Sequence, residues 1–208
     1  MENKGRLIVF EGIDGAGKTT QIELLTSYLR DQKNRRVYRT AEPTESVTGG
    51  LLRDALGGIV RRSPCELAAL FVLDRIFHNV NPVNGIEKLT GEGVDVISDR
   101  YYYSSMAYQG SETDPEWVGR MNLDCPEIRR PDICIFLDLT PEQSMKRILK
   151  GRVTQEIYET HERLEAVRNR FMKVIDDLRA KGENIHIVNA DRSIEEIQAE
   201  IRQIVDQI

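Results

Sequence analysis

The stretch from Gly12 to Thr20, Gly-Ile-Asp-Gly-Ala-Gly-Lys-Thr-Thr, constrains this chain more than any other part of it. It follows an apolar run at 7–10 and precedes residues 21–29, whose apolar spacing predicts a helix. A glycine-rich loop between a strand and a helix, ending in Lys-Thr, is the pattern of a phosphate-binding loop. Its backbone N–H groups can face phosphate oxygens, and the helix N-terminus adds positive potential. The sequence therefore predicts that the chain binds a nucleoside triphosphate.

The side chains of this loop have separate expected roles. Lys18 is placed to reach the β- and γ-phosphates, and the hydroxyl of Thr19 is placed to bind Mg²⁺. All residues of the loop are predicted to contact the triphosphate, namely Gly12, Ile13, Asp14, Gly15, Ala16, Gly17, Lys18, Thr19 and Thr20.

Length and composition indicate a single cytoplasmic domain over 1–208. A chain of 208 residues is large enough to bury one substantial core. Its net charge of −5 argues against a nucleic-acid-binding surface, and its longest apolar runs are too short to span a membrane. The first residues show no signal-peptide pattern. Cys65, Cys125 and Cys134 are far apart without a Cys-x-x-Cys pair, so we expect reduced thiols.

Short apolar runs alternate with longer helical patterns, which is typical of βαβ units and a parallel sheet. We expect an α/β fold with five parallel strands and helices on both faces, and with the second strand near an edge because it is less apolar. In such folds ligands bind beyond the carboxyl ends of the strands. The predicted strands are 6–10, 36–40, 94–98, 133–139 and 184–188, and the predicted helices are 17–30, 49–56, 64–80, 82–90, 115–122, 141–149, 157–181 and one that follows Ser193.

The last helix carries an apolar stripe at helical spacing. We interpret this stripe as core packing rather than as a surface for a partner or a membrane. Its members are Ile194, Ile197, Ile201, Ile204 and Ile208.

Two further places pair residue types that suit nucleotide chemistry. Asp99 and Arg100 directly follow the third strand, where an acid can hold Mg²⁺ and an arginine can bridge phosphates. Phe71 and Arg75 lie one helical turn apart, so a ring and a guanidinium share one face and could contact a base. For Asp99 and Arg100 the alternative is a surface ion pair, and for Phe71 it is ordinary core packing.

The segment Lys150-Gly151-Arg152 separates two predicted helices. A basic break there could close over a transferring phosphoryl group and exclude water. An ordinary turn with solvated charges is the alternative.

The sequence lacks the motifs that are typical of a GTPase switch protein. The only Asn-Lys pair, Asn3-Lys4, precedes the first strand and lacks the Asp of a guanine-reading segment. Asp99 is followed by Arg-Tyr-Tyr instead of x-x-Gly. A phosphoryl acceptor other than water is therefore favoured.

Taken together, these segments resemble the thymidylate kinase family, which belongs to the P-loop nucleoside monophosphate kinases. The run 99–110, Asp-Arg-Tyr-Tyr-Tyr-Ser-Ser-Met-Ala-Tyr-Gln-Gly, is its most specific part. The resemblance covers nearly the whole chain, with further matches at 10–20, Glu42-Pro43, Arg53, 70–78 and 131–138. It implies the P-loop NTPase fold with a short lid at about 150–156, transfer from ATP to dTMP with Mg²⁺, and a homodimer.

The resemblance also implies roles for individual residues. Tyr108 would fill the space that a 2′-hydroxyl needs, and Phe71 would stack on thymine. The implied catalytic residues are Lys18, Arg100, Arg152 and Asp14, and the implied metal-binding residues are Thr19 and Asp99. The implied substrate-binding residues are Asp14, Glu42, Arg53, Phe71, Arg75, Arg100, Ser104, Ser105, Tyr108 and Gln109.

The chain departs from common bacterial members of this family at two places. Ala41 stands where those members carry arginine, and Thr44-Glu45 replaces a Gly-Gly pair. Three alternative functions stay open: a kinase for another monophosphate such as UMP or dUMP, a deoxynucleoside kinase, and a nucleotide-binding module without activity.

Overall fold

The computed structural model describes residues 4–151 and 160–208. These residues form a five-stranded parallel sheet with the strand order β2-β3-β1-β4-β5. The predicted α/β class is confirmed, and each strand begins and ends within one residue of the prediction. The strands are β1 (Leu7–Glu11), β2 (Arg36–Ala41), β3 (Val94–Asp99), β4 (Ile133–Asp138) and β5 (Ile185–Asn189).

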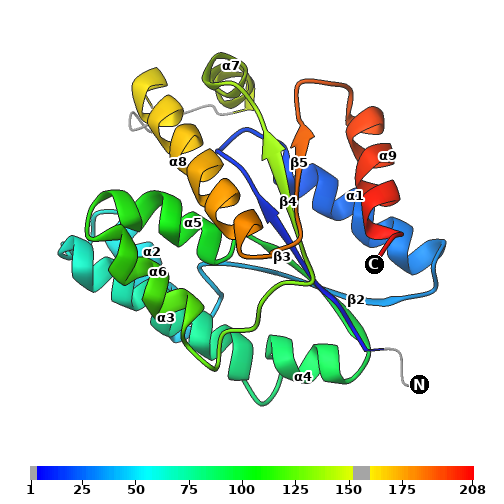
Figure 1. Ribbon diagram of the computed structural model, residues 1–208, viewed down its shortest axis with the longest axis horizontal. Helices are drawn as coiled ribbons and strands as arrows, with labels where there is room; N and C mark the ends of the chain where they lie inside the picture. Colours follow the sequence, from blue (N-terminus) through cyan, green and yellow to red (C-terminus); the bar gives the residue numbers. More distant parts are fainter. Residues whose placement is uncertain (1–3, 152–159) are drawn as a thin grey trace.

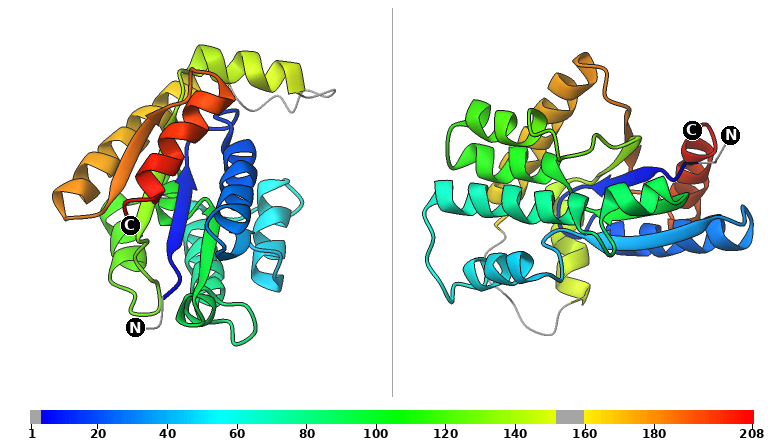
Figure 2. Two further views of the ribbon diagram at one scale, coloured as in Figure 1. Left: turned by 90° about the vertical axis from the view of Figure 1, so that its right-hand side faces the viewer. Right: turned by 90° about the horizontal axis from the view of Figure 1, so that it is seen from below.

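Helices cover both faces of the sheet, and α1 and α9 lie together against one of them (Figure 1). Helices α3, α4, α5 and α8 supply side chains to the core on the opposite face, and Figure 2 shows the two layers from other directions. The helices are α1 (Lys18–Asp31), α2 (Val47–Leu56), α3 (Pro64–Val80), α4 (Ile86–Gly91), α5 (Tyr102–Tyr108), α6 (Pro115–Leu123), α7 (Pro141–Gly151), α8 (His161–Ala180) and α9 (Ile194–Val205), with a 3₁₀ turn, η1, at Gln109–Ser111.

Alternation along β1 divides the core into two parts. Leu7 and Val9 face the cluster that includes Phe171 of α8, whereas Ile8 and Phe10 face the cluster of α1 and α9. Side chains of a strand point alternately to opposite faces, so an apolar run in a central strand is buried on both sides. This explains why β1 is apolar without a polar alternation.

Strand β1 lies between β3 and β4, and its pairing with β3 positions the site. Phe10 stands opposite Asp99 in the register of these two strands. The loop that leaves β1 and the Asp99-Arg100 pair that ends β3 therefore emerge side by side. Strand β2 is an edge strand, which confirms its predicted place.

Several predicted segments differ from the structure, and helix α7 continues to Gly151, two residues beyond its predicted end. The expected helix at 82–90 begins only at Ile86, because the Asn81 side chain accepts hydrogen bonds from the N–H groups of Val83 and Asn84 and so forms a turn. The tyrosine-rich segment, for which we predicted no helix, forms α5. Helix α8 begins at His161 after its cap, Thr160, and the remaining part of its prediction, 157–159, lies outside the described residues.

The structure corrects the apolar stripe of the last helix. Ile197 and Ile201 are buried, and Ile204 packs against the same cluster. The side chains of Ile194 and Ile208 are 49% and 42% exposed. Ile194 is the first residue of α9 and Ile208 lies beyond its end at Val205, so neither belongs to the buried face of the helix.

Cys65, Cys125 and Cys134 are all free thiols. Within 4–151 and 160–208, no helix combines the length and the apolar character needed to cross a membrane.

The two kinds of position on α9 predict different effects on stability. Ile201→Ala should lower the free energy of unfolding by about 2–5 kcal/mol, because the removed methyl groups leave a cavity in the core. Ile194→Ala should change it by no more than about 0.5 kcal/mol, since that side chain is half exposed. Urea unfolding followed by circular dichroism measures both; equal midpoints for the two variants would contradict this account of α9.

Candidate functional site

The glycine-rich loop connects β1 to α1 and needs its glycines. Gly12, Gly15 and Gly17 have φ angles of 145°, 78° and 94°, which residues with a Cβ rarely adopt. A Cβ at Gly12 would lie 2.7 Å from the carbonyl oxygen of Leu137 on β4. Gly17 is the N-cap residue just before α1, and because glycine has no side chain, no side-chain hydrogen bond caps the first N–H groups of the helix. Those N–H groups are available to an anion.

Lys18 is buried beside this loop. Its Nζ donates a hydrogen bond to the carbonyl oxygen of Gly12 at 3.1 Å and lies 4.0 Å from Oδ1 of Asp99. Burial lowers the pKa of Lys18, and the cation of Arg100 lowers it further. The nearby carboxylates act in the opposite direction, so a bound polyphosphate would add to the groups that favour the charged lysine.

Arg100 lines the same cavity as Lys18. Its Nη2 donates to Oδ1 of Asp14, its Nη1 donates to Oγ of Ser104 at 3.1 Å, and its guanidinium lies 5.7 Å from the ring centre of Tyr108. Burial disfavours the charged form, but the neighbouring groups outweigh it and raise the pKa of Arg100. The guanidinium is therefore a permanent cation at the end of β3.

Predicted residues from four segments meet around a cavity of about 620 Å³. Lys18, Arg53 and Arg100 are its predicted cations, and Arg53 reaches it from α2. A cavity with several cations beside a glycine-rich loop suits a chain of phosphate groups. The predicted residues among its lining are Asp14, Gly15, Gly17, Lys18, Thr19, Thr20, Glu42, Arg53, Asp99 and Arg100.

The sequence analysis missed Arg147 and Ile148, which also line this cavity from α7. Nη2 of Arg147 donates to the carbonyl oxygen of Ala190 at 2.8 Å, and the Ser144 hydroxyl donates to the carbonyl oxygen of Asp14 at 2.6 Å. Residues 144, 147 and 148 share one helical face, and this spacing was the signal available in the sequence. Which charged residue of the helix faces the loop depends on how α7 packs.

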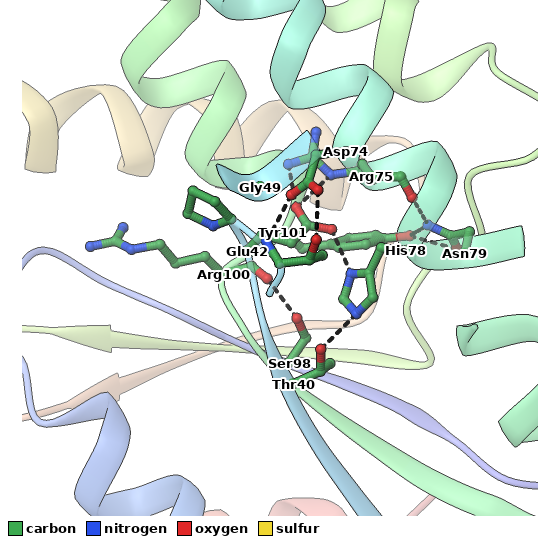
Figure 3. A network of polar contacts seen from close by, with 12 residues as sticks. Thr40, Glu42, Gly49, Asp74, Arg75, His78, Asn79, Ser98, Arg100 and Tyr101 are labelled. Atoms are coloured by element: carbon green, nitrogen blue, oxygen red, sulfur yellow. Dashed lines mark hydrogen bonds and ion pairs between the residues drawn. The ribbon is translucent and has the colours of Figure 1, made fainter. Parts of the chain in front are cut away.

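Arg75 and Glu42 form a buried ion pair under the cavity (Figure 3). Nε and Nη2 of Arg75 donate to Oε2 of Glu42, Nη2 also donates to Oγ of Ser105, and Nη1 donates to Oδ1 of Asn122. The other carboxylate oxygen of Glu42 lies 2.9 Å from Nδ1 of His78. Since Glu42 also lines the cavity, this network connects the cavity wall to α3.

Asp74, the residue before Arg75, holds the segment 44–48 by hydrogen bonds. This segment includes Thr44-Glu45, where the chain differs from common bacterial members of the family that its sequence resembles. Its carboxylate accepts from the N–H and the hydroxyl of Thr44, and from the hydroxyls of Ser46 and Thr48. Thr44, which stands where common bacterial members carry a glycine, is therefore held by two hydrogen bonds to Asp74. Glu45 points outward, with its carboxylate 3.7 Å from the Arg53 guanidinium.

The remaining predicted residues are not part of the described lining of the cavity. Ser104 and Tyr108 adjoin it through Arg100, and Ser105 adjoins it through Arg75. The predicted lid was 150–156, but residues 150 and 151 belong to helix α7 and form no break in it. Arg152 and the rest of the predicted lid, 153–156, lie outside the described residues. The described lining does not include Gly12, Ile13, Ala16, Phe71, Arg75, Ser104, Ser105, Tyr108 or Gln109, of which Phe71 is half-buried and Gln109 buried.

A family model described as thymidylate kinase matches residues 10–201. This chain belongs to the thymidylate kinase family. The "Probable thymidylate kinase" of Methanococcus aeolicus is 38% identical over 209 residues, with 97% of each chain covered. The "Thymidylate kinase" of Akkermansia muciniphila is 38% identical over 204 residues, covering 97% of this chain and 92% of that one. The family and its P-loop fold, predicted from the sequence, are therefore confirmed.

The ion pair of this thymidylate kinase family member predicts a stability effect. Glu42→Gln should lower the free energy of unfolding by about 3 kcal/mol, because it leaves the buried Arg75 cation without its counter-charge. Glu45→Gln is the matched control and should change it by less than about 1 kcal/mol, because the Glu45 side chain is 98% exposed. Urea denaturation measures both variants, and a Glu42→Gln value as small as the control value would show that the pair contributes nothing.

Proposed function

We propose that this protein transfers the γ-phosphoryl group of ATP to dTMP and forms ADP and dTDP. The observation that carries the proposal is the cavity in which the glycine-rich loop and Lys18 meet Asp99 and Arg100. Membership of the thymidylate kinase family supports dTMP as the acceptor. Arg53 supports an acceptor that already carries a phosphate, because it adds a cation on the α2 side of the cavity.

The proposed reaction needs positioning and charge rather than a strong base. The attacking oxygen of a nucleoside monophosphate is already ionised at neutral pH, so no side chain has to remove a proton from it. Backbone N–H groups of the loop, Lys18 and Arg100 would hold the phosphates in line and stabilise the charge on the transferring group. Arg152 would add a further cation from the lid in this proposal.

Mg²⁺ fits the residues at the end of β3. Oδ1 of Asp99 is buried and, among the described residues, has no hydrogen-bond partner. The Thr19 side chain is exposed toward the same cavity. In 4–151 and 160–208 no three His, Cys, Asp or Glu residues are grouped as a metal site, so phosphate oxygens and water would complete the shell. When bound, Mg²⁺ supplies positive charge to the phosphate oxygens.

For the acceptor base we propose Phe71, Arg75, Ser105 and Gln109, with Tyr108 excluding a 2′-hydroxyl. Arg75 supports this proposal because its guanidinium is held rigidly and offers only hydrogen-bond donors, which suit a base carbonyl. Thymine and uracil differ by one methyl group, which contributes only about 1–3 kcal/mol to discrimination. Kinases for dUMP or UMP therefore remain the second candidate, ahead of a deoxynucleoside kinase.

The proposal is tested by ADP release from ATP and Mg²⁺ with a panel of acceptors: dTMP, dUMP, UMP, CMP, AMP, GMP and thymidine. We expect dTMP to be the best acceptor. Faster turnover of UMP or dUMP would keep the phosphate machinery and overturn the base and sugar assignments. Faster turnover of thymidine would overturn the monophosphate assignment, and no turnover with any acceptor would overturn the proposed activity.

Lys18 gives a sharper prediction for the same assay. Lys18→Ala should lower kcat with dTMP by at least about 100-fold, because it removes a buried cation from the phosphate site. Lys33→Ala is the matched control, since Lys33 is a surface lysine paired with Asp206, and its kcat should stay within about twofold of the wild type. A Lys18→Ala enzyme with nearly normal kcat would remove Lys18 from the proposed mechanism.

We also propose that the protein is a homodimer, formed through α2 and α3. Leu73, Phe77 and Val80 of α3 share one helical face and are 49%, 40% and 44% exposed. Leu51 and Val47 add exposed apolar surface on the neighbouring helix α2. A second copy of the same stripe would bury this surface around a twofold axis.

The dimer prediction is tested by light scattering coupled to size-exclusion chromatography. The wild type should have twice the mass of the 23.8 kDa chain, and Leu73→Asp/Phe77→Asp should have the mass of one chain. Ile194→Asp is the control for an exposed apolar residue on the opposite side of the sheet and should stay dimeric. A monomeric wild type, or a dimeric double variant, would contradict the proposed interface.

A further inference from the structure

Arg100 has a backbone conformation that is unusual for its residue type. Its φ is +71°, which lies in the left-handed region, and among the described residues Asn34 is the other non-glycine residue there. Asparagine adopts this region far more readily than arginine, whose Cβ crowds the following carbonyl group. A residue keeps such a conformation only where its surroundings determine it, and such residues are often part of a functional site.

The surroundings hold both peptide groups that flank the Arg100 Cα. On the N-terminal side, the Arg100 N–H donates to the carbonyl oxygen of Phe10 at 2.9 Å, and the carbonyl oxygen of Asp99 accepts from the Glu42 N–H at 3.0 Å. On the C-terminal side, the Ser98 hydroxyl donates to the carbonyl oxygen of Arg100 at 2.8 Å (Figure 3). Since each peptide group is planar, fixing both planes fixes φ and ψ of the residue between them.

Glu11 completes this arrangement from the end of β1. Its Oε1 accepts from the Tyr101 N–H at 2.8 Å, so the fourth polar atom of the two peptide groups also has a partner. The Glu11 carboxylate further accepts from the N–H and the hydroxyl of Ser104, at 3.1 and 2.7 Å. That same Ser104 oxygen accepts from Nη1 of Arg100. Glu11 therefore holds both the backbone after Arg100 and one contact of its guanidinium.

Glu11 and Ser98 are completely buried and do not line the described part of the cavity, so they act through other residues. With φ at +71°, the Arg100 side chain reaches Asp14 in the glycine-rich loop. Rotation of either flanking peptide would turn the Cα–Cβ bond and carry the guanidinium away from the loop. The two buried side chains are thus placed to control where one cation of the site points.

We propose that Glu11 and Ser98 are positioning residues for phosphoryl transfer, which hold Arg100 in the left-handed conformation that aims its guanidinium at the phosphate groups. The proposal rests on the proposed kinase function. It differs from a general structural role of the two residues in one respect: their contribution to the rate exists only when Arg100 has its guanidinium. This difference can be measured.

The test is a pair of double-mutant cycles with Arg100. Kcat and KM are measured for Glu11→Gln, Ser98→Ala and Arg100→Ala, and for each of the first two combined with Arg100→Ala, with single-turnover assays for the slow variants. We expect each positioning variant to lower kcat by about tenfold or more, with KM for ATP changed less than about twofold. In the Arg100→Ala background, neither should lower kcat further by more than about twofold. Losses that multiply in the double variants would overturn the proposal.

Thr26→Ala is the matched control for Ser98→Ala. Thr26 is also buried, and its hydroxyl donates to the carbonyl oxygen of Ile22 within α1, away from the cavity. The kcat of Thr26→Ala should stay within about twofold of the wild type. A tenfold loss in this control would show that removal of any buried hydroxyl slows the enzyme, and it would overturn the positioning role of Ser98. Circular dichroism is used to check that each variant folds. If Glu11→Gln does not fold, the double-mutant cycle of Ser98→Ala with Arg100→Ala is sufficient for the test.

A second readout does not depend on activity. In a crystal structure of Ser98→Ala we expect φ of Arg100 to become negative and its guanidinium to leave Asp14. An unchanged φ and an unchanged Asp14 contact would overturn the proposal. A wild type that phosphorylates none of the acceptors would instead contradict the proposed function, and this crystal structure would still decide whether Ser98 holds Arg100.

Discussion

The parallel pairing of β1 with β3 is the constraint on which the site depends. It places Phe10 opposite Asp99, so the loop after one strand and the Asp99-Arg100 pair after the other begin at the same edge. Lys18 and Arg100 then both line the cavity in which phosphates would bind. Both strands are buried on both faces, which holds their register firmly, because a slip by one residue would reverse every buried side chain.

Charge in this site is arranged in two layers. The described lining of the cavity holds four cationic and four carboxylate side chains, and one of these carboxylates, Glu42, is already paired with the buried Arg75. The deeper cation, Arg75, is paired with Glu42 and also donates to two neutral acceptors, Asn122 and Ser105. The carboxylate of Glu42 holds the Arg75 guanidinium in place and balances its charge in the core. The first layer lines the cavity, and the second holds the Arg75 guanidinium in a fixed position.

Helix α5 connects these layers. Glu11 bonds the N–H groups at its start, and the same short helix carries Ser104 next to Arg100 and Ser105 next to Arg75. Two adjacent serines thus contact the phosphate side and the proposed base side of the site. These buried contacts to Glu11 help to hold the tyrosine-rich segment Tyr102–Tyr108 as a helix, although the sequence analysis did not include it among the predicted helices.

The sequence by itself determined the α/β class, the five strands and the phosphate-binding loop, because strand burial and glycine-dependent backbone geometry are local properties written in residue type and spacing. It also placed Arg75 on one helical face with Phe71, but it did not identify the ion-pair partner of Arg75, Glu42, 33 positions away. Tertiary structure alone decided that Arg147 faces the loop, that Ile194 and Ile208 lie outside the core, and that Arg100 is left-handed. These depend on which distant groups the packed strands and helices bring together, and no local pattern encodes such distances.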